Sequence, residues 1–301
     1  MGAERLRWLA EAAAVRGLAF ALGLAPKGLR RRIGRSLGRL AFRVDRRHRE
    51  VALENLAAAY PDEPETWRQG VARSAFEHLG RLLVEILDQR HGAAGILPEV
   101  RVEGWEHLVR ASEEGRGYFL LSGHFGNWER VAFLQAAMGH PLWMVARPLD
   151  NPRLERFFQG LREGTGNKVV HKRNAVREMV RGLKKGAGIA FVVDQNFGEE
   201  GRIFVPFFGR PAATTPSLGR IAARLGVPVV PVFSFPEEEG RYRIVYGPPL
   251  PAPVSTDPEE AGREITAAAT ARLEEAVRAC PGAWFWMHRR WRTRPQDGEV
   301  E

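Results

Sequence analysis

Between residues 100 and 250 the chain alternates short apolar runs with segments of helical character. Runs of this length bounded by turn residues are typical of buried strands. Five of them predict strands, at 118–121, 142–146, 189–193, 227–235 and 242–246, and three segments between them predict helices, at 154–163, 175–185 and 215–225. This alternation predicts an α/β fold with a mixed central sheet flanked by helices.

The remainder of the chain is predicted to be largely helical. Residues 1–95 have a helical pattern throughout, and 258–279 form a further helix rich in alanine and glutamate. No Ser/Gly linker, repeat or low-complexity tract divides the 301 residues, a length that suits one large domain or two modest ones. We therefore expect a helical arm at 1–50 followed by one α/β domain at 51–301.

The arm carries a basic amphipathic pattern within 29–44. Its apolar residues recur at three- and four-residue steps, and arginines fill most of the other positions. The uncharged stretch before it, 17–26, is ten residues long, whereas a bilayer-spanning helix needs roughly 20. We expect an arm that lies in the membrane interface, and the alternative is a solvated helix packed on the domain. The apolar positions are Leu29, Ile33, Leu37, Leu40, Ala41 and Val44.

The net charge of +9 belongs to this arm. Residues 1–50 hold thirteen Arg and Lys against four Asp and Glu, while the other residues balance at 32 against 32. A basic arm binds nucleic acid or an anionic bilayer, and the chain contains no recognised nucleic-acid-binding module. We therefore expect an anionic membrane surface as a partner and no nucleic acid, with about 1 kcal/mol from each basic residue near the surface.

Candidate chemistry lies where the predicted strands end. The run at 118–121 leads through a turn to His124, and Glu129 falls in the first turn of the next helix, while two further runs end at Arg147 and Asp194. Because open α/β sheets bind ligands at the carboxyl ends of their strands, we expect these side chains to converge there. A histidine beside a carboxylate is the minimal apparatus for general-base catalysis on a hydroxyl.

Several ordered motifs resemble those of the bacterial lipid A biosynthesis acyltransferases. These late acyltransferases add secondary acyl chains to the endotoxin precursor and belong to the lysophospholipid acyltransferase superfamily. The segment from His124 to Glu129 is similar to the superfamily's H-x4-D/E block, and the matching blocks cover most of the chain. The others are Arg147-Pro148 with Asp150-Asn151-Pro152, Arg162, Val193-Asp194-Gln195, Val205-Pro206-Phe207-Phe208-Gly209, Ala212-Ala213-Thr214-Thr215, and Trp284 to Pro295, where Arg292 stands in place of the family's lysine.

The resemblance implies a glycerolipid acyltransferase-like fold and direct acyl transfer from a thioester to a glycolipid hydroxyl. The implied donor is acyl carrier protein, with coenzyme A left open, and the implied acceptor is a phosphorylated glycolipid, a lipid A precursor. We expect no cofactor and no metal. The implied location is the cytoplasmic face of the inner membrane, as a peripheral or monotopic protein.

The implied site is centred on a dyad in which His124 is the general base and Glu129 orients the imidazole. Arg147 and Arg162 are expected either to stabilise the oxyanion or bind a phosphate, or to form structural ion pairs. The remaining candidates are Asn151, Asp194 and Gln195 for hydrogen bonds, Phe207 and Phe208 for an acyl channel or the core, and Arg289, Arg290 and Arg292 for headgroup phosphates, beside interfacial tryptophans.

Other functions stay open at this point. Mannosylated phosphatidylinositol or a lysophospholipid would serve as acceptor for the same motifs, and water as acceptor would make the protein a hydrolase. Ser122 lies beside His124 but lacks the G-x-S-x-G elbow of Ser-His hydrolases. A non-catalytic membrane adaptor would keep the fold and the arm, although His124 and Glu129 both argue against it. Cys280 is the only cysteine, which excludes an internal disulfide and a thiolate metal cluster.

Overall fold

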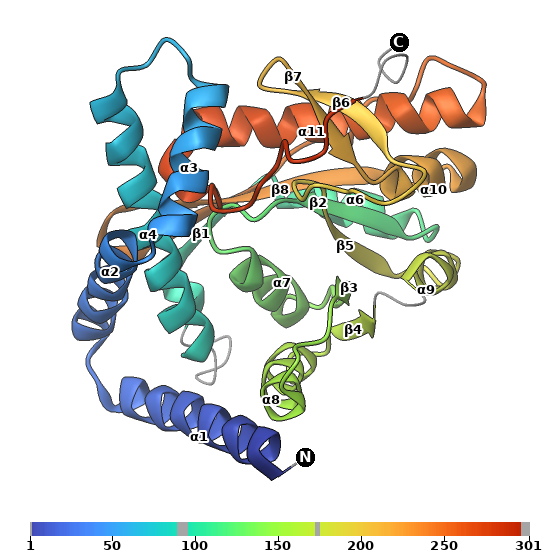
Figure 1. Cartoon of the computed structure of the whole chain (residues 1–301). Coiled ribbons are helices and arrows are strands. Elements are labelled where there is room, and N and C mark those ends of the chain that lie inside the picture. The colour runs from blue at the N-terminus through green and yellow to red at the C-terminus, as the bar shows by residue number, and fades with distance from the viewer. Residues whose placement is uncertain (1, 89–95, 172–174, 296–301) are drawn as a thin grey trace.

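The computed structural model describes residues 2–88, 96–171 and 175–295. Its centre is a seven-stranded sheet in the order β1-β9-β8-β2-β5-β3-β4 (Figure 1). Five strands from β8 to β4 run parallel, β9 pairs antiparallel with β8, and β1 is parallel to β9. The strands are β1 (Val100–Glu103), β2 (Tyr118–Ser122), β3 (Leu142–Ala146), β4 (Lys168–His171), β5 (Gly188–Val192), β8 (Val229–Pro236) and β9 (Tyr242–Tyr246). The mixed sheet predicted from the sequence is confirmed.

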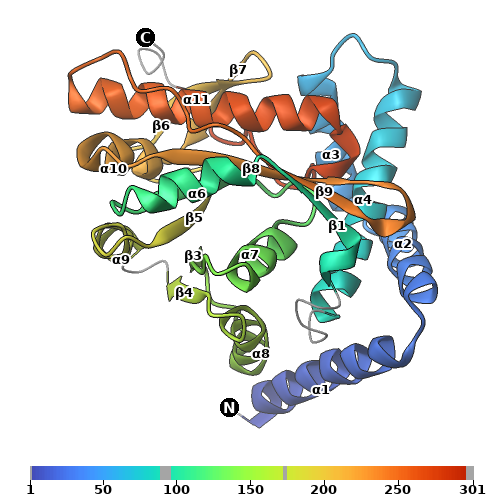
Figure 2. The ribbon, with the colours of Figure 1, turned by 180° about the vertical axis from the view of Figure 1, so that it is seen from behind.

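Helices cover both faces of this sheet (Figures 1 and 2). In β2 alternate side chains point to opposite faces, so Phe119 and Leu121 join one core while Tyr118 and Leu120 join another. The first core is completed by α9 (Ala175–Leu183), α10 (Ser217–Leu225) and α11 (Pro258–Ala279), and the second by α6 (Trp105–Glu113) and α7 (Trp128–Ala137). Burial on both faces explains why the central strands are continuously apolar.

A separate hairpin, β6 (Ile203–Phe207) and β7 (Arg210–Thr214), lies beside α11. Its two-residue turn has positive φ at both positions, 53° at Phe208 and 68° at Gly209. Such angles match the twist of a tight hairpin but are uncommon for a bulky residue. Phe208 is held by ring contacts with Phe207, Tyr60 and Trp286, so the packing of the turn overrides its local preference.

The four described α-helices that precede β1 are called the N-terminal layer; the last three pack together at one end of the sheet, and the first runs along the bottom of the view (Figure 1). They are α1 (Gly2–Leu24), α2 (Lys27–Val44), α3 (Arg46–Ala59) and α4 (Glu65–Leu87). α1 also contacts α8 (Pro152–Glu163), the helix that joins β3 to β4. Three short 3-10 turns, η2 (Leu97–Glu99), η4 (Glu238–Gly240) and η5 (Pro281–Ala283), complete the described elements.

α2 packs against α4 through glycines and not through its leucines. A Cβ on Gly38 would lie 2.2 Å from the carbonyl oxygen of Phe76, and a Cβ on Gly80 would lie 2.2 Å from that of Gly34. The two backbones are therefore too close for side chains between them. The consequence is that Leu29, Leu37, Leu40 and Val44 are between 44% and 69% exposed. The expected boundary at residue 50 falls inside α3.

Candidate active site

The turn between β2 and α7 has a backbone that few residues allow. Gly126 has a φ of 58°, and a Cβ there would lie 1.6 Å from the carbonyl oxygen of Ser234. Asn127 follows as the N-cap of α7, and its side-chain oxygen accepts the backbone N–H of Arg130 at 2.9 Å. The turn therefore holds His124 just before the helix and Glu129 in its first turn.

The strand order brings His124 to Asp194. β2 and β5 are parallel neighbours, so the residues that follow them share one edge of the sheet. His124 Nδ1 lies 2.8 Å from Asp194 Oδ1, and the backbone N–H of His124 donates to Asp194 Oδ2 at 2.6 Å. Trp284 Nε1 donates to the same oxygen at 2.9 Å. Asp194 is buried and accepts hydrogen bonds from three N–H groups.

These contacts fix the proton on the imidazole. Burial would raise the pKa of Asp194, but the charge and hydrogen bonds of His124 and the hydrogen bond from Trp284 lower it to about 2. The carboxylate is therefore ionised at neutral pH and can only accept hydrogen bonds. The proton of a neutral His124 must then lie on Nδ1, which leaves Nε2 free to accept a proton.

His124 is also a stronger base than an ordinary histidine. Burial alone would lower the pKa of its imidazole, but the charge of Asp194, the hydrogen bond to it and the charge of Glu129 raise that pKa above its usual value. The side chain is 21% exposed, so a bound molecule can reach it. The rings of Trp128 and Phe285 flank the imidazole, with centroids 5.0 and 6.3 Å away.

Glu129 is hydrogen-bonded to Arg162 and not to the imidazole. Arg162 on α8 donates from Nε to Oε2 at 3.1 Å and from Nη2 to Oε1 at 2.5 Å, a bidentate pair. We expected Glu129 to orient His124, but the carboxylate at Nδ1 is Asp194. The reason is topological, because β5 ends beside His124 whereas α7 carries Glu129 toward α8.

Three other predicted residues lie outside the His124–Asp194 contact. Arg147 follows β3 at the same sheet edge, is exposed, and makes no hydrogen bond or ion pair with another residue in the described part of the chain. Asn151 is buried, caps α8, and donates to the backbone oxygen of Trp8 and to Glu11 on α1. The side chain of Gln195 is exposed, although the residue directly follows Asp194.

Phe207 and Phe208 lie in the core. They are 0% and 6% exposed, and their rings contact each other and those of Trp284 and Trp286. Of the two roles expected for these phenylalanines, acyl channel or core, their burial favours the core.

The closing segment 281–295 packs against the turn between β2 and α7. The carbonyl of Ala283 accepts the N–H of Gly126 at 2.9 Å, and the N–H of Phe285 donates to the carbonyl of His124 at 3.0 Å. Trp284 and Trp286 are buried, so they do not form the exposed headgroup-facing surface that we expected of these tryptophans. Arg289 and Arg292 are exposed.

Arg290 is the buried arginine of this segment. It donates to the carbonyl of Ala213 at 2.7 Å, to that of Gln195 at 3.3 Å and to Thr214 Oγ1 at 2.7 Å. Its side chain is 0% exposed, and burial lowers the pKa of its guanidinium to about 10. This placement does not fit the phosphate contact expected of Arg290, because the side chain is fully buried and its Nη1 and Nη2 already donate to Ala213, Gln195 and Thr214.

The sequence interpretation missed two residues that hold the loop after Asp194. His288 Nε2 accepts the N–H of Asn196 at 2.7 Å, and Thr293 makes two hydrogen bonds of 3.0 Å with the Asn196 side chain. Both belong to the closing motif, and the polar residues of that motif are the only feature of the sequence that could have indicated their role. The closing segment therefore holds the loop after Asp194 in place.

Ser122 does not contact the base. Its hydroxyl donates to the carbonyl of Val232 at 2.9 Å and the side chain is buried. This geometry argues against a Ser-His hydrolase.

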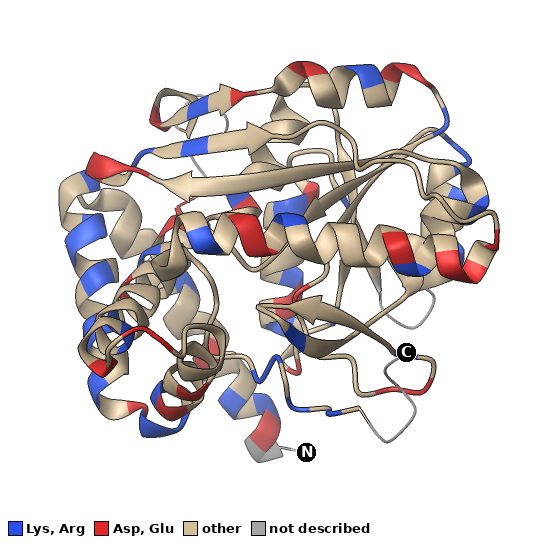
Figure 3. Ribbon diagram, turned by 90° about the horizontal axis from the view of Figure 1, so that it is seen from above, with Lys and Arg blue, Asp and Glu red and all other residues tan. Residues whose placement is uncertain are grey.

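The N-terminal layer has an exposed surface that is both apolar and basic. Leu6, Leu9, Phe20 and Leu24 of α1 are 50% to 74% exposed, and the leucines of α2 are exposed as well. Lys and Arg recur along the helices of this layer, at the left of Figure 3. Among the described residues, no helix has both the length and the apolar character needed to cross a membrane.

Comparison with known proteins agrees with these motifs. The family model described as "Bacterial lipid A biosynthesis acyltransferase" matches residues 3–293. The chain is 30% identical to the lipid A biosynthesis lauroyltransferase of Escherichia coli K12 over 88% of this chain and 86% of that protein. It is 28% identical to the palmitoleoyltransferase of the same organism, over 87% and 85% of the two chains, and 24% identical to its myristoyltransferase, over 98% and 88%. The chain belongs to the bacterial lipid A biosynthesis acyltransferase family.

Proposed function

We propose that this protein is a membrane-associated acyltransferase that moves a fatty acyl chain from an acyl carrier protein thioester to a hydroxyl of a lipid A precursor. The observation that carries the proposal is the His124 imidazole held by a buried carboxylate at the carboxyl edge of the sheet. The names of the relatives, all lipid A acyltransferases, supply the substrate class.

In the proposed reaction, Nε2 of His124 takes the proton of the acceptor hydroxyl while the hydroxyl oxygen attacks the thioester carbonyl. Asp194 stabilises the imidazolium that forms. The tetrahedral intermediate then collapses, the carbon–sulfur bond breaks, and the thiolate leaves with the proton from His124. The products are the new ester and the free thiol, and no acyl-enzyme is required.

Arg162 is our candidate for stabilising the oxyanion. Glu129 occupies its Nε and Nη2, so Nη1 still has donors that make no hydrogen bond with another described residue. In this proposal Glu129 acts through Arg162, by holding the guanidinium in place, and through the charge that it adds near His124. The proposed site thus keeps both His124 and Glu129, but Glu129 holds Arg162 in place and does not orient the imidazole.

The exposed arginines Arg147, Arg289 and Arg292 are our candidates for the phosphates of the acceptor. Guanidinium groups bind phosphate through paired N–H donors. Gln195, exposed beside Asp194, is the candidate for a hydrogen bond to a sugar hydroxyl. Asn151 is assigned an indirect role, because it fastens α8, and with it Arg162, to α1.

We also propose that α1 and α2 bind the cytoplasmic face of the inner membrane. Their exposed apolar side chains, together with the arm's basic excess, suit insertion beside anionic headgroups. The triple substitution of Leu29, Leu37 and Leu40 by serine should weaken binding to anionic vesicles in a flotation assay by at least about tenfold. Val254→Ser, at an exposed apolar residue outside the layer, is the control, and equal flotation of both variants would contradict the proposal.

The reaction is tested by mass spectrometry of the products formed from acyl carrier protein thioesters and under-acylated lipid A. The acceptor should gain one acyl mass with the unmutated protein, and His124→Ala should lower the rate by about 10² or more. A transfer only from coenzyme A thioesters would correct the donor, and a transfer only to mannosylated phosphatidylinositol or a lysophospholipid would correct the acceptor. Free fatty acid alone would indicate a hydrolase, and no turnover with any pair would support the adaptor.

A further inference from the structure

Helix α4 contacts the turn between β2 and α7, residues 123–127, with side chains that the proposed reaction does not use. We propose that Glu85 and Asn127 are positioning residues, whose hydrogen bond fixes the turn that carries His124 and the start of α7 that carries Glu129. The consequence for catalysis rests on the proposed function, whereas the contact itself can be tested without it.

The contact is short and buried. Asn127 is 1% exposed and donates from Nδ2 to Glu85 Oε2 at 2.7 Å, while its Oδ1 caps α7 through the N–H of Arg130. Both ends of this amide are therefore satisfied, one by the helix it starts and one by α4. A side chain with two such partners has a single orientation, which transmits the position of α4 to the turn.

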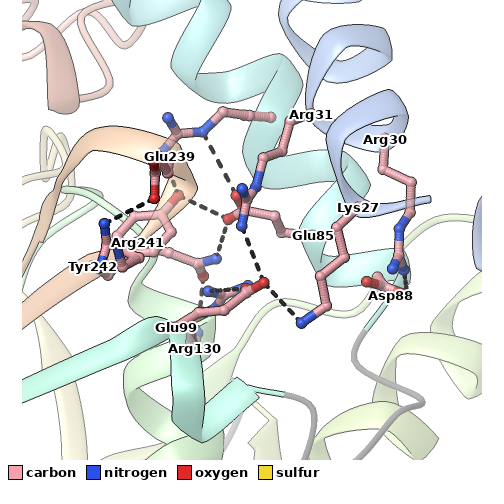
Figure 4. A network of polar contacts seen from close by, with 12 residues as sticks. Lys27, Arg30, Arg31, Glu85, Asp88, Glu99, Arg130, Glu239, Arg241 and Tyr242 are labelled. Carbon is pink, nitrogen blue, oxygen red and sulfur yellow. Dashed lines mark hydrogen bonds and ion pairs between the residues drawn. The ribbon is translucent and has the colours of Figure 1, made fainter.

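Glu85 is itself held by two further side chains, one from β9 and one from α4 itself (Figure 4). Tyr242 on β9 donates its hydroxyl to Glu85 Oε2 at 2.7 Å, and Arg81 donates to that hydroxyl at 2.8 Å. Arg81 Nε also lies 3.6 Å from Glu85 Oε1. The carboxylate that receives Asn127 is thus fixed by side chains from a helix and from the sheet, which makes it a rigid anchor.

A second side chain of α4 reaches the same turn. His78 lies two helical turns before Glu85, and burial lowers the pKa of its imidazole while the nearby backbone of Gly126 opposes that shift. Residues seven positions apart lie on one face of a helix, so α4 presents this face to Gly126 and Asn127 together. The same turn is also hydrogen-bonded through its backbone to Ala283 and Phe285.

The neighbouring ion pairs extend the contact to α2. Arg130, which follows Glu129, donates to Glu99 at 3.2 Å, and Glu99 also pairs with Lys27 and Arg31 of α2 at 3.0 Å each. Figure 4 shows these charged groups turned toward one another between α2 and α4. The proposed membrane-binding helix and the start of α7 therefore share one polar network.

The test is an exchange of the two functional groups. Asn127→Asp keeps a good helix cap but places a second carboxylate against Glu85, and we expect kcat to fall about 10²-fold, the cost of a misplaced catalytic group. The double variant Glu85→Gln/Asn127→Asp restores an amide–carboxylate hydrogen bond in reverse, and we expect it to recover at least about tenfold in kcat. KM should change little, because neither residue is assigned to substrate.

Asn127→Ser provides a second variant that keeps a capping oxygen without adding charge. It should lower kcat about tenfold, the effect of one lost hydrogen bond to a charged group. Glu77→Gln is the matched control, since Glu77 is on the same helix and pairs only with Arg35 and Arg39 among the described residues. We expect its kcat and KM to equal those of the unmutated protein.

Hydrogen exchange of residues 123–130 provides a readout that does not depend on activity. It should be faster in Asn127→Ser and Asn127→Asp and return toward the unmutated rate in the double variant. Unchanged exchange and kcat in both single variants would overturn the proposal, as would a double variant as impaired as Asn127→Asp. Faster exchange in the two single variants, together with no acyl transfer by the unmutated protein, would instead refute the proposed function and leave the contact standing.

Discussion

Replacing Asp194 with asparagine changes one atom type at the centre of the site. Asp194 Oδ2 accepts two N–H groups, from the His124 backbone and from Trp284, so the asparagine oxygen must occupy that position. The amide nitrogen then faces Nδ1 of His124, where the carboxylate oxygen accepted a hydrogen bond. Two donors cannot share that contact, so the imidazole must move its proton to Nε2.

The expected loss in kcat is about 10³-fold or more, which corresponds to roughly 4 kcal/mol in the activation barrier. The base in this variant is present but carries its proton on the nitrogen that should accept one. The free energy of unfolding should fall by only about 1–3 kcal/mol, because two of the three hydrogen bonds remain. The variant should therefore fold and bind substrates.

The pH profile gives a second, independent signature. The proposed base acts when His124 is neutral, so kcat/KM should fall as the pH drops through the pKa of this imidazole, which Asp194 and Glu129 hold above its ordinary 6.5. Without the charge of Asp194, burial lowers that pKa, and the acidic limb should move to lower pH.

The assay is acyl transfer from pH 5.5 to 9 over a range of acceptor concentrations, which gives both kcat and kcat/KM, with urea unfolding to confirm the fold. Asp257→Asn is the control, because Asp257 caps α11 and asparagine caps a helix equally well. An Asp194→Asn enzyme that keeps more than a tenth of kcat with an unmoved acidic limb would refute the assignment of Asp194.

Four further substitutions extend the account. Glu129→Gln should weaken the bidentate pair with Arg162 and lower kcat about 10- to 100-fold, but the acidic limb should stay above that of Asp194→Asn, and the opposite order in a pH profile would show that Glu129 is the main partner of His124. Trp284→Phe removes one donor to Asp194 and should cost about tenfold in kcat, so full activity in steady-state kinetics would mean that this bond is dispensable. Gly38→Ala forces a Cβ to within 2.2 Å of the Phe76 carbonyl and should lower the free energy of unfolding by about 1–3 kcal/mol. Gly70→Ala in α4 has open space and should raise that free energy by about 0.5–1 kcal/mol, and urea titrations showing equal effects would contradict the glycine contact.

The strands that hold the site were readable from the sequence because they are buried on both faces. The predictions at 142–146 and 242–246 coincide with β3 and β9, and 258–279 with α11. β1 was missed because two of its four residues, Arg101 and Glu103, are charged, which removes the apolar signal. The β6–β7 hairpin was missed as strands because each strand contains a proline, a residue that argues against a strand.

In the N-terminal arm, the periodicity of apolar residues predicted the helix but not the face by which it packs. The pattern at 29–44 predicts a helix, and α2 spans it, but its leucines do not mark the packed face. The buried face contains Gly34 and Gly38, which contribute almost no hydrophobicity and so no visible stripe. Two helix backbones can approach this closely only where glycine leaves out the side chain, and a missing side chain adds nothing to a hydrophobic pattern. The partner glycine, Gly80 on α4, also lies far from α2 in the sequence.

In the site, the sequence predicted which residues share one sheet edge better than which of them touch. His124 and Asp194 were both placed at one sheet edge, and they meet there. The carboxylate nearest in sequence, Glu129, was given the role at Nδ1, although contact across neighbouring strands decided the pairing. Glu85 was not found at all, because its only signal is spatial and α4 lies about forty residues before the turn.

The most direct test is the protonation state of the His124 imidazole, read from nitrogen chemical shifts of protein labelled with ¹⁵N-histidine, with His124→Ala to assign the signal. The account predicts a neutral form protonated on Nδ1 in the unmutated protein and in Glu129→Gln, a pKa above the ordinary histidine value, and a change to the Nε2 tautomer in Asp194→Asn. A neutral imidazole already protonated on Nε2 in the unmutated protein would contradict the account, because His124 would then have no free nitrogen facing the acceptor hydroxyl.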